Sequence, residues 1–246
     1  FRGRSASAAL PQSRRSLLRV APFVDISEMG HWQELGLDFA IAGVDNCGTT
    51  ALQRHLSEHP DIVFPDDNEE WFFHRRSERL LPYKSQISEF RARVSSAAED
   101  KRKATGILPR IRGITNPIFF RDVLVLKAMS LIPRLKVLLV ACDPLGRLER
   151  RYLEWVSGRS RDSEKKEHAH ELYELRGSKF KTLWHSSRLE EPLTRTFLLF
   201  SERTLLLHRD AMRDAPEGFF PVVAAFVGAA ASRQPLRFRR FNAWGG

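Results

Sequence analysis

The segment that decides the fold is DFAIAGVDNCGTTALQRHL, residues 38 to 56. A short apolar run ends at Gly43, a turn with a second glycine follows, and a run with helical character begins at Thr50. A strand, a loop and a helix in this order place the loop at the carboxyl end of the strand. Small residues there let backbone N–H groups face an anion, and the helix N-terminus adds its dipole. We therefore predict a phosphate-binding loop over residues 43–50.

The alternation of apolar runs and helical patterns continues along the chain. Lys136 begins a run that is apolar through Ala141, which is typical of a strand buried on both faces, and Asp143-Pro144 ends it. We further predict an extended segment at 61–65, helices at 85–103, 148–156 and 219–227, and a buried strand at 196–201. The last helix has Gly228 as its C-terminal cap.

These elements predict an α/β fold with a P-loop-like central parallel sheet and helices on both faces. Ligands in such folds bind beyond the carboxyl ends of the strands. Three segments are expected to converge there: the loop at 43–50, the residues from Asp143 onward, and Ser201-Glu202.

Length and composition favour a single globular unit. The chain has 246 residues, of which 42% are hydrophobic, and lengths up to about 250 residues are compatible with one domain. Residues 1–34 form a basic tail, which we interpret as a disordered terminus or a stem, and residues 35–246 form the domain, possibly truncated at its C-terminus. No stretch approaches the roughly 18 apolar residues that span a bilayer, so we expect no transmembrane segment in this chain.

The net charge of +10 is concentrated in two places, the tail and a stretch at 101–136 whose one acid is Asp122. That stretch indicates either an anionic partner or a solvated helix face, and net charge alone does not separate the two. The two cysteines give no disulfide framework and no zinc spacing.

The loop differs from that of a nucleoside triphosphatase. Such a loop needs a lysine where Thr49 stands, so that an ammonium reaches the β- and γ-phosphates. This difference argues against hydrolysis of ATP or GTP. A glycine turn without any ligand is the alternative interpretation.

The loop resembles that of the sulfotransferase family, which has the form Gly-x-x-Lys-Ser-Gly-Thr-Thr. Other segments match in the right order: residues 53–60 resemble the family's first helix, 68–73 its Lys-Glu-x-His-Phe-Phe segment, 136–152 its Leu-Arg-Asp-Pro strand and helix, 200–202 its late strand, and 226–228 its closing Phe-Leu-Gly. The resemblance covers about residues 38 to 228 and extends to the carbohydrate and heparan sulfotransferases.

The resemblance implies transfer of a sulfuryl group from 3′-phosphoadenosine-5′-phosphosulfate (PAPS) to a hydroxyl or amine acceptor, with a glycan as the expected acceptor class. Glu69 would be the general base; the alternative is one more acid in a solvated acidic loop. The cofactor-binding residues would be Gly43, Asn46, Cys47, Gly48, Thr49, Thr50, Cys142, Arg147 and Arg150. No metal and no nucleic-acid partner is expected. The resemblance favours the Golgi lumen or membrane, with any anchor upstream of residue 1.

The chain departs from the family pattern at several of these positions. Asn46 replaces the loop lysine, Cys142 replaces the arginine for the 3′-phosphate, and Arg150 replaces its serine partner and returns a positive charge. On the acceptor side, Asn68 replaces a lysine and Trp71 a histidine. Loss of one preorganised donor costs on the order of 10²- to 10³-fold in turnover.

These departures leave two other functions open. One is a sulfotransferase-like module that binds a nucleotide, a polyanion or a protein partner with little or no turnover. The other is another P-loop transferase, such as a small-molecule kinase. Cys47 and Cys142, aligned near the two phosphate ends of the cofactor, are either a thiol switch or two small packed residues.

Overall fold

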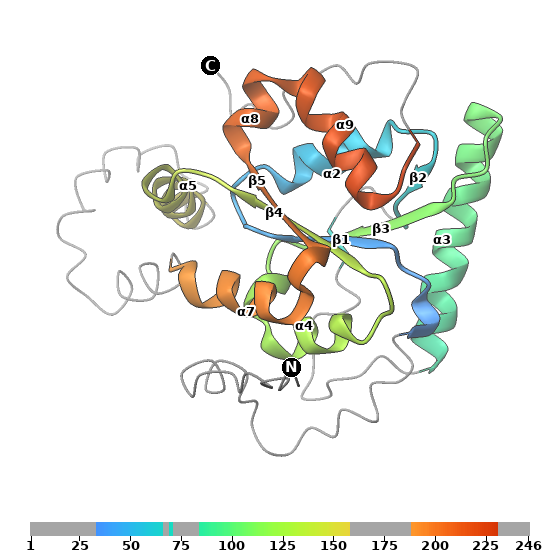
Figure 1. Cartoon of the computed structure of the whole chain (residues 1–246), viewed down its shortest axis with the longest axis horizontal. Helices are drawn as coiled ribbons and strands as arrows, with labels where there is room; N and C mark the ends of the chain where they lie inside the picture. Colours follow the sequence, from blue (N-terminus) through green and yellow to red (C-terminus); the bar gives the residue numbers. More distant parts are fainter. Residues whose placement is uncertain (1–32, 66–68, 71–83, 158–187, 231–246) are drawn as a thin grey trace, which may run out of the picture.

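The computed structural model of the chain describes residues 33–65, 69–70, 84–157 and 188–230. In this part of the chain, five parallel strands form one sheet in the order β2-β3-β1-β4-β5 (Figure 1). The strands are β1 (Phe39–Gly43), β2 (Ile62–Val63), β3 (Ile111–Thr115), β4 (Lys136–Ala141) and β5 (Thr204–His208). The predicted α/β fold with a central parallel sheet is confirmed.

Helices cover both faces of the sheet, as predicted. Figure 1 shows α2, α8 and α9 on one face, α4 and α7 on the other, and α3 beside the end of the sheet formed by β2 and β3. The helices are α2 (Thr49–Ser57), α3 (Lys84–Thr105), α4 (Val123–Ser130), α5 (Pro144–Ser157), α7 (Glu190–Phe200), α8 (Arg209–Asp214) and α9 (Pro216–Val227). Two short 3₁₀ helices, η2 (Phe119–Arg121) and η4 (Ser201–Arg203), lie between them.

The core is built on the two central strands. All five residues of β1 are buried, and so are the four middle residues of β4, because helices cover both of their faces. β1 pairs with β3 on one side and with β4 on the other, with Ala40 opposite both Ile114 and Val137. The carboxyl end of β1 therefore lies between the carboxyl ends of β3 and β4. The candidate site lies at this edge of the sheet.

Gly43 is required where β1 ends. A Cβ at this position would lie 2.4 Å from Cδ1 of the Phe120 ring, a distance that van der Waals contact does not allow. The absence of a side chain lets η2 pack directly under the start of the loop.

The predicted strand at 196–201 is wrong. These residues end α7 and begin η4, and the strand is β5, which starts three residues later at Thr204. The two fully buried residues of α7, Thr196 and Phe200, are four positions apart, which is the spacing of one helix face rather than of a strand. Ser201-Glu202 thus precedes β5 and lies at its amino end, so it does not converge with the loop as expected.

β3 is absent from the sequence prediction. It has only five residues, and Arg112 and Gly113 interrupt its apolar character. Its pairing with β1 and β2 places it inside the sheet nonetheless. The other predicted elements are confirmed within a few residues, including the C-terminal cap Gly228, which has φ 95°.

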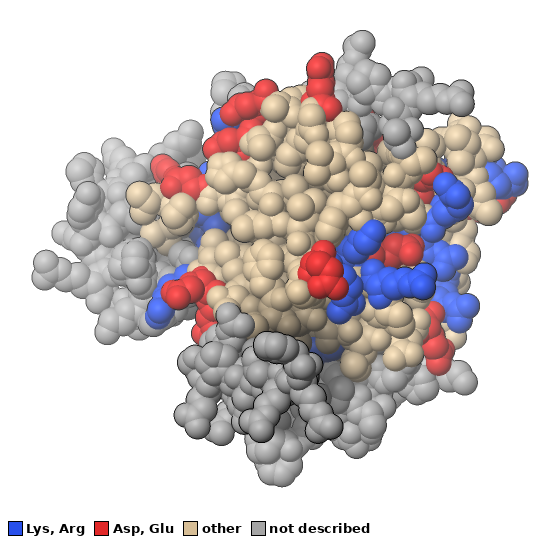
Figure 2. Space-filling model, viewed as in Figure 1, with Lys and Arg blue, Asp and Glu red and all other residues tan. Residues whose placement is uncertain are grey.

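The basic stretch at 101–136 does not form a uniform positive surface. Arg102, Lys103 and Arg110 pair with Glu99, Asp100 and Asp61, and Arg121 turns inward to Asp45. Figure 2 shows blue and red side chains interspersed on the side of the molecule where α3 lies in Figure 1. On the face shown in Figure 2, the mixture of charges favours the interpretation of this stretch as a solvated surface over that of a site for an anionic partner.

Candidate functional site

The predicted phosphate loop, residues 43–50, lies at the carboxyl edge of β1 and leads directly into α2. It is tied to the sheet by the N–H of Val44, which donates to Val140 O at 3.2 Å, and closed by the N–H of Cys47, which donates to Val44 O at 3.2 Å. Gly48, with φ 100°, caps α2 without a side chain. The first N–H groups of a helix have no intrahelical acceptor, so the start of α2 offers several donors and the positive end of a dipole.

Asp45 in this loop holds three arginines from two elements. Its Oδ1 lies 2.6 Å from Arg147 Nη2 and 3.1 Å from Arg121 Nη2, and its Oδ2 lies 3.3 Å from Arg151 Nη1. Arg147 also donates from Nε to the backbone O of Asp45 at 2.9 Å. The guanidinium of Arg147 is fully buried, so Asp45 is the counter-charge that makes this position tolerable.

Burial and the Asp45 carboxylate have opposite effects on the pKa of two arginines of this cluster. Burial lowers the pKa of Arg121 to about 10, while the carboxylate of Asp45 acts in the opposite direction. Burial likewise lowers the pKa of Arg147, again opposed by Asp45. One carboxylate thus faces three guanidinium groups beside the loop.

Cys47 and Cys142 form a disulfide, which the sequence analysis did not predict. The bond joins the phosphate loop to the carboxyl end of β4 across 95 residues of sequence, with Cα atoms 5.3 Å apart. Register explains the pairing, because adjacent parallel strands bring the residues that follow β1 and β4 to the same edge. Cys47 is fully buried and Cys142 is 9% exposed.

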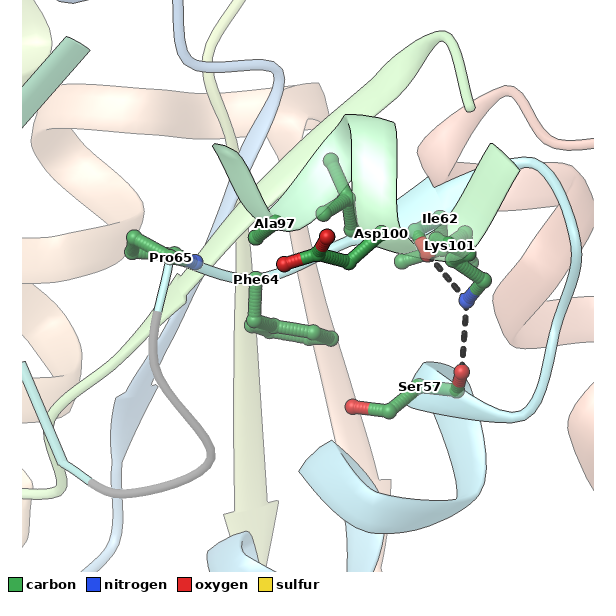
Figure 3. A pocket seen from close by; sticks show the side chains of 8 residues that line it. Ser57, Ile62, Phe64, Pro65, Ala97, Asp100 and Lys101 are labelled. Carbon is green, nitrogen blue, oxygen red and sulfur yellow. Dashed lines mark hydrogen bonds between the residues drawn. The ribbon is translucent and has the colours of Figure 1, made fainter. Parts of the chain in front are cut away.

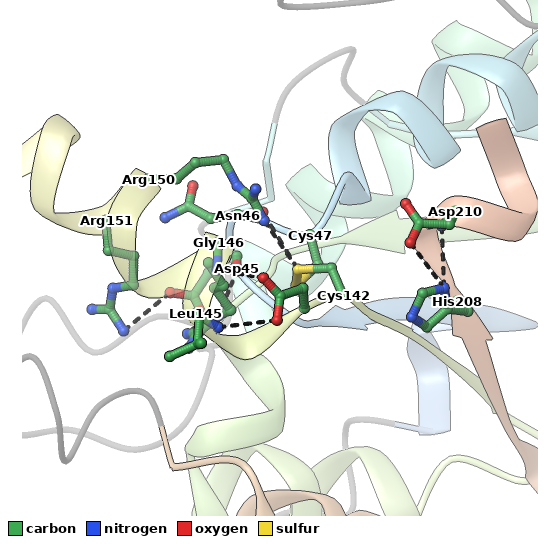
Figure 4. Close-up of a disulfide and its surroundings, with 12 residues drawn as sticks. Asp45, Asn46, Cys47, Cys142, Leu145, Gly146, Arg150, Arg151, His208 and Asp210 are labelled. Carbon is green, nitrogen blue, oxygen red and sulfur yellow. Dashed lines mark hydrogen bonds and ion pairs between the residues drawn. A yellow bond between two sulfur atoms is a disulfide. The ribbon is translucent and has the colours of Figure 1, made fainter.

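A second pair of cations, Arg150 and Arg209, lies beside the loop. Arg150, from α5, donates from Nε to Asn46 O at 3.0 Å (Figure 4). Arg209 begins α8, and its Cγ would lie 3.8 Å from a Cβ at Gly48. Burial lowers the pKa of Arg150 and the charge of Arg209 lowers it further, while the carboxylates of Asp143 and Glu149 act in the opposite direction. Within the described residues, neither forms an ion pair with a carboxylate.

The structure brings the predicted cofactor-binding residues together around one loop. Gly43, Asn46, Cys47, Gly48, Thr49 and Thr50 form it, and Cys142, Arg147 and Arg150 border it from β4 and α5. One of these residues differs from the prediction. Arg147 was expected to bind the cofactor, but its side chain is directed to Asp45. Asp143 caps α5 by accepting from the N–H of Gly146 at 2.7 Å, which accounts for Asp143-Pro144 as a helix start.

The candidate base, Glu69, lies in a segment anchored beside the loop. The N–H of its neighbour Glu70 donates to Thr115 O at 2.7 Å, and Asn116 Nδ2 donates to Glu70 O at 2.9 Å. The carboxylate of Glu70 is buried and pairs with Arg93 at 3.0 Å. Glu70 is thus structural, and Glu69 remains the predicted base. Asn68 and residues 71–73 of the matched segment lie outside the described residues.

Four contributors to the site were not singled out from the sequence: Asp45, Arg121, Arg151 and Arg209. Asp45 could have been recognised from the sequence, since it is the one acidic residue inside the loop. Arg209 was missed because it follows β5 directly, and the sequence prediction had placed the end of that strand at residue 201.

No helix among the described residues is long and apolar enough to cross a membrane. The same residues contain no group of three or more His, Cys, Asp or Glu side chains arranged to hold a metal ion.

A separate cavity of about 420 Å³ lies between α3, β2 and the end of α2 (Figure 3). Lys101 closes one side of it, donating from Nζ to Ser57 O and Ile62 O, each at 2.5 Å. These two carbonyls end α2 and begin β2, so Lys101 links two elements. Its role is structural.

Lys101 predicts a specific pH dependence of stability. Burial lowers its pKa to about 8, below the ordinary value of 10.5 that it regains on unfolding. Between these values the unfolded chain holds more protons, so the free energy of unfolding rises with pH in this window. We expect the wild type to gain about 1 to 2 kcal/mol relative to Lys101→Met between pH 7.5 and 10, after allowance for partial exposure. Urea titrations of both proteins measure the difference, and parallel pH profiles would contradict it.

Taken together, the parallel sheet, the loop after β1 and the helix that starts at its end give the chain a sulfotransferase-like fold. The crystal structure of a sulfotransferase from Alicyclobacillus acidocaldarius matches with a TM-score of 0.54 and 23% identity, over 79% of this chain and 81% of that chain. The sulfotransferase domain from the curacin biosynthetic pathway has a TM-score of 0.49 and 14% identity, over 79% and 75% of the two chains. The sulfotransferase domain from the Synechococcus PCC 7002 olefin synthase has a TM-score of 0.45 and 14% identity, over 79% and 73%. No family model and no curated protein matches the sequence.

Proposed function

We propose that the protein transfers a sulfuryl group from PAPS to a hydroxyl or amine acceptor, with a glycan as the acceptor class to test first. The observation that carries the proposal is the pair Arg150 and Arg209 beside the start of α2. These two cations repel each other and form no salt bridge with a carboxylate of the described residues, although Asp143 and Glu149 act on Arg150 from a greater distance. The anionic groups of a nucleotide bound beside them and the helix N-terminus would relieve that repulsion.

The donor set fits the 5′-phosphosulfate end of PAPS better than the 3′-phosphate end. At one end of the loop, the N-terminus of α2 offers its first N–H groups, Thr50 lies in the first turn of that helix, and the Cγ of Arg209 lies near Gly48. At the other end Cys142 cannot supply a charge, so Arg150 is the cation available to the 3′-phosphate.

Sulfuryl transfer depends on alignment of the nucleophile and on stabilisation of the leaving phosphate. The helix N-terminus and Arg209 would hold the leaving phosphate, in place of the lysine that Asn46 replaces. Asp45 keeps Arg121, Arg147 and Arg151 at fixed positions, so these residues set the loop rather than contact the nucleotide. Glu69 would accept the proton of the acceptor's hydroxyl or amine.

Calorimetric titration with adenosine 3′,5′-bisphosphate, the product that competes for the same cleft, tests the nucleotide site. We expect micromolar binding by the full chain with its disulfide intact. Absence of detectable binding would contradict the proposal. Binding would be followed by a screen of acceptors with radiolabelled PAPS.

Arg209 is expected to contribute directly to this binding. Arg209→Ala should weaken the affinity for the bisphosphate by about ten- to a hundredfold, because hydrogen bonds to charged groups contribute about 1.5 to 3 kcal/mol. Arg213→Ala is the matched control, since Arg213 lies on the same short helix and is paired with Asp210 and Asp214. Equal affinities of the two variants would exclude Arg209 from the site.

One observation favours the alternative of a binding module with weak or no turnover. The loop carries a carboxylate at Asp45 and no lysine at Asn46, so its own charge is opposite to the one that the transferred group requires. Tight binding of the bisphosphate without sulfation of any acceptor in the screen would support this alternative.

A further inference from the structure

The disulfide lies within the phosphate loop. Cys47 immediately precedes Gly48, the cap of α2, and Cys142 immediately follows β4 (Figure 4). The sequence contains no other cysteine, so no alternative pairing within the chain competes with this bond. A change in the oxidation state of the two sulfurs therefore acts directly on the loop.

Arg150 connects the disulfide to the anion site. Its Nη2 lies 3.2 Å from Cys142 Sγ, while its Nε donates to Asn46 O. In the disulfide neither sulfur can carry a charge, so the guanidinium retains its full charge for a bound anion. A thiolate at either position would compete with that anion for the same cation.

Other charged groups face the pair from each element packed around it. Asp45 is occupied by its three arginines, Asp143 caps α5, and at the end of β5 the N–H of Asp210 donates to His208 Nδ1 at 3.3 Å. Figure 4 shows Asp45 of the loop, Arg150 of α5, and His208 and Asp210 from the end of β5 and from α8 in the surroundings of the disulfide. The charges that act on Arg150 are those of Arg209, Asp143, Glu149 and Arg147. Among these groups, Arg150 and Arg209 are the cations that form no salt bridge with a carboxylate of the described residues, and Asp143 and Glu149 offset the charge of Arg150 only from a greater distance. A new negative charge would therefore be drawn to these two cations.

We propose that reduction of the Cys47–Cys142 disulfide switches the phosphate loop from tight to weak anion binding. This inference rests on the proposed function and concerns the regulation of the same site. The reductant is a dithiol. One of its thiolates attacks the Sγ of Cys142, the more exposed of the two residues. The Sγ–Sγ bond breaks, and Cys47 leaves as a thiolate. The second thiol of the reductant resolves the mixed disulfide, so the reductant is oxidised to its cyclic disulfide and the protein gains two electrons and two protons.

Of the two thiols produced, Cys142 is the one placed to ionise. It lies beside the Arg150 guanidinium, an environment that favours the thiolate, whereas burial of Cys47 opposes the effect of the N-terminus of α2. The thiolate of Cys142 puts negative charge where the phosphate groups would bind. The loss of affinity should therefore grow as pH rises and this thiol ionises.

The test is calorimetric titration of the full chain with adenosine 3′,5′-bisphosphate before and after treatment with excess dithiothreitol, at pH 6.5 and 8.5. We expect reduction to weaken binding at least about tenfold at pH 8.5 and less at pH 6.5, because charge-assisted contacts are lost. The double variant Cys47→Ser, Cys142→Ser is the matched control, since serine cannot ionise in this range. The affinity of this variant should be the same with and without the reductant at each pH.

The possible outcomes separate the inference from the proposed function. Equal binding by the oxidised and reduced proteins at both pH values overturns the switch and leaves the nucleotide site intact. Absence of binding by the oxidised protein overturns the proposed function. Near-UV circular dichroism of the reduced protein is recorded in parallel. Loss of its signal would mean that the disulfide holds the whole fold together, and this too would overturn a local switch.

Discussion

Asp45→Asn should destabilise the protein by about 3 to 5 kcal/mol, the cost of removing one charge of a buried ion pair. The substitution keeps the size of the side chain and removes the charge that faces Arg147, Arg121 and Arg151. Arg147 is fully buried and cannot turn to water. Urea denaturation followed by circular dichroism measures the change in the free energy of unfolding.

The matched control is Asp100→Asn. Asp100 pairs with Lys103 at 3.5 Å on the surface of α3, with both side chains more than half exposed, and such pairs contribute about 1 kcal/mol or less. A loss of stability at Asp45 as small as that at Asp100 would contradict the assignment of Asp45 as the counter-charge of a buried arginine.

Glu69→Gln should lower kcat by about 10²- to 10⁴-fold if Glu69 accepts the proton of the acceptor. The amide has nearly the same shape, so the affinity for adenosine 3′,5′-bisphosphate should not change. The acidic limb of the pH–rate profile, which reports ionisation of the base, should disappear as well. Steady-state kinetics with radiolabelled PAPS and the best acceptor of the screen measure these quantities.

The adjacent Glu70→Gln distinguishes a catalytic loss from a structural one. Glu70 pairs with Arg93 and its backbone is bound to Thr115 and Asn116, so its substitution should lower the melting temperature more than that of Glu69 and affect kcat less. Full turnover by Glu69→Gln would remove Glu69 from the mechanism.

The sequence predicts those elements of the fold whose pattern lies within a run of consecutive residues. The run from Phe39 to Gly43, the two glycines of the loop and the start of α2 are contiguous, and the apolar run of β4 is long enough to identify. The apolar residues of α7 were mistaken for a strand because a short apolar run lacks visible periodicity. The difference appears only when Thr196 and Phe200 are seen to share the buried side of α7.

The site was predicted less completely because it depends on contacts between distant residues. Asp45 and Arg147 are 102 residues apart, and Cys47 and Cys142 are 95 apart. The register of β1 against β4 brings both pairs together, and no local pattern encodes that register. The loop residues themselves were found because they are consecutive.

The disulfide also determines how the molecule would respond to tension. A force applied at the two chain ends passes from Cys47 to Cys142 through the sulfur–sulfur bond and bypasses the 95-residue segment between them. On the order of 300 Å of contour length would thus stay locked under load. That segment contains β2, β3 and β4, so only β1 and β5 of the sheet lie on the loaded path. Under load, unfolding would proceed inward from the two ends of the chain and would stop at the disulfide in the phosphate loop.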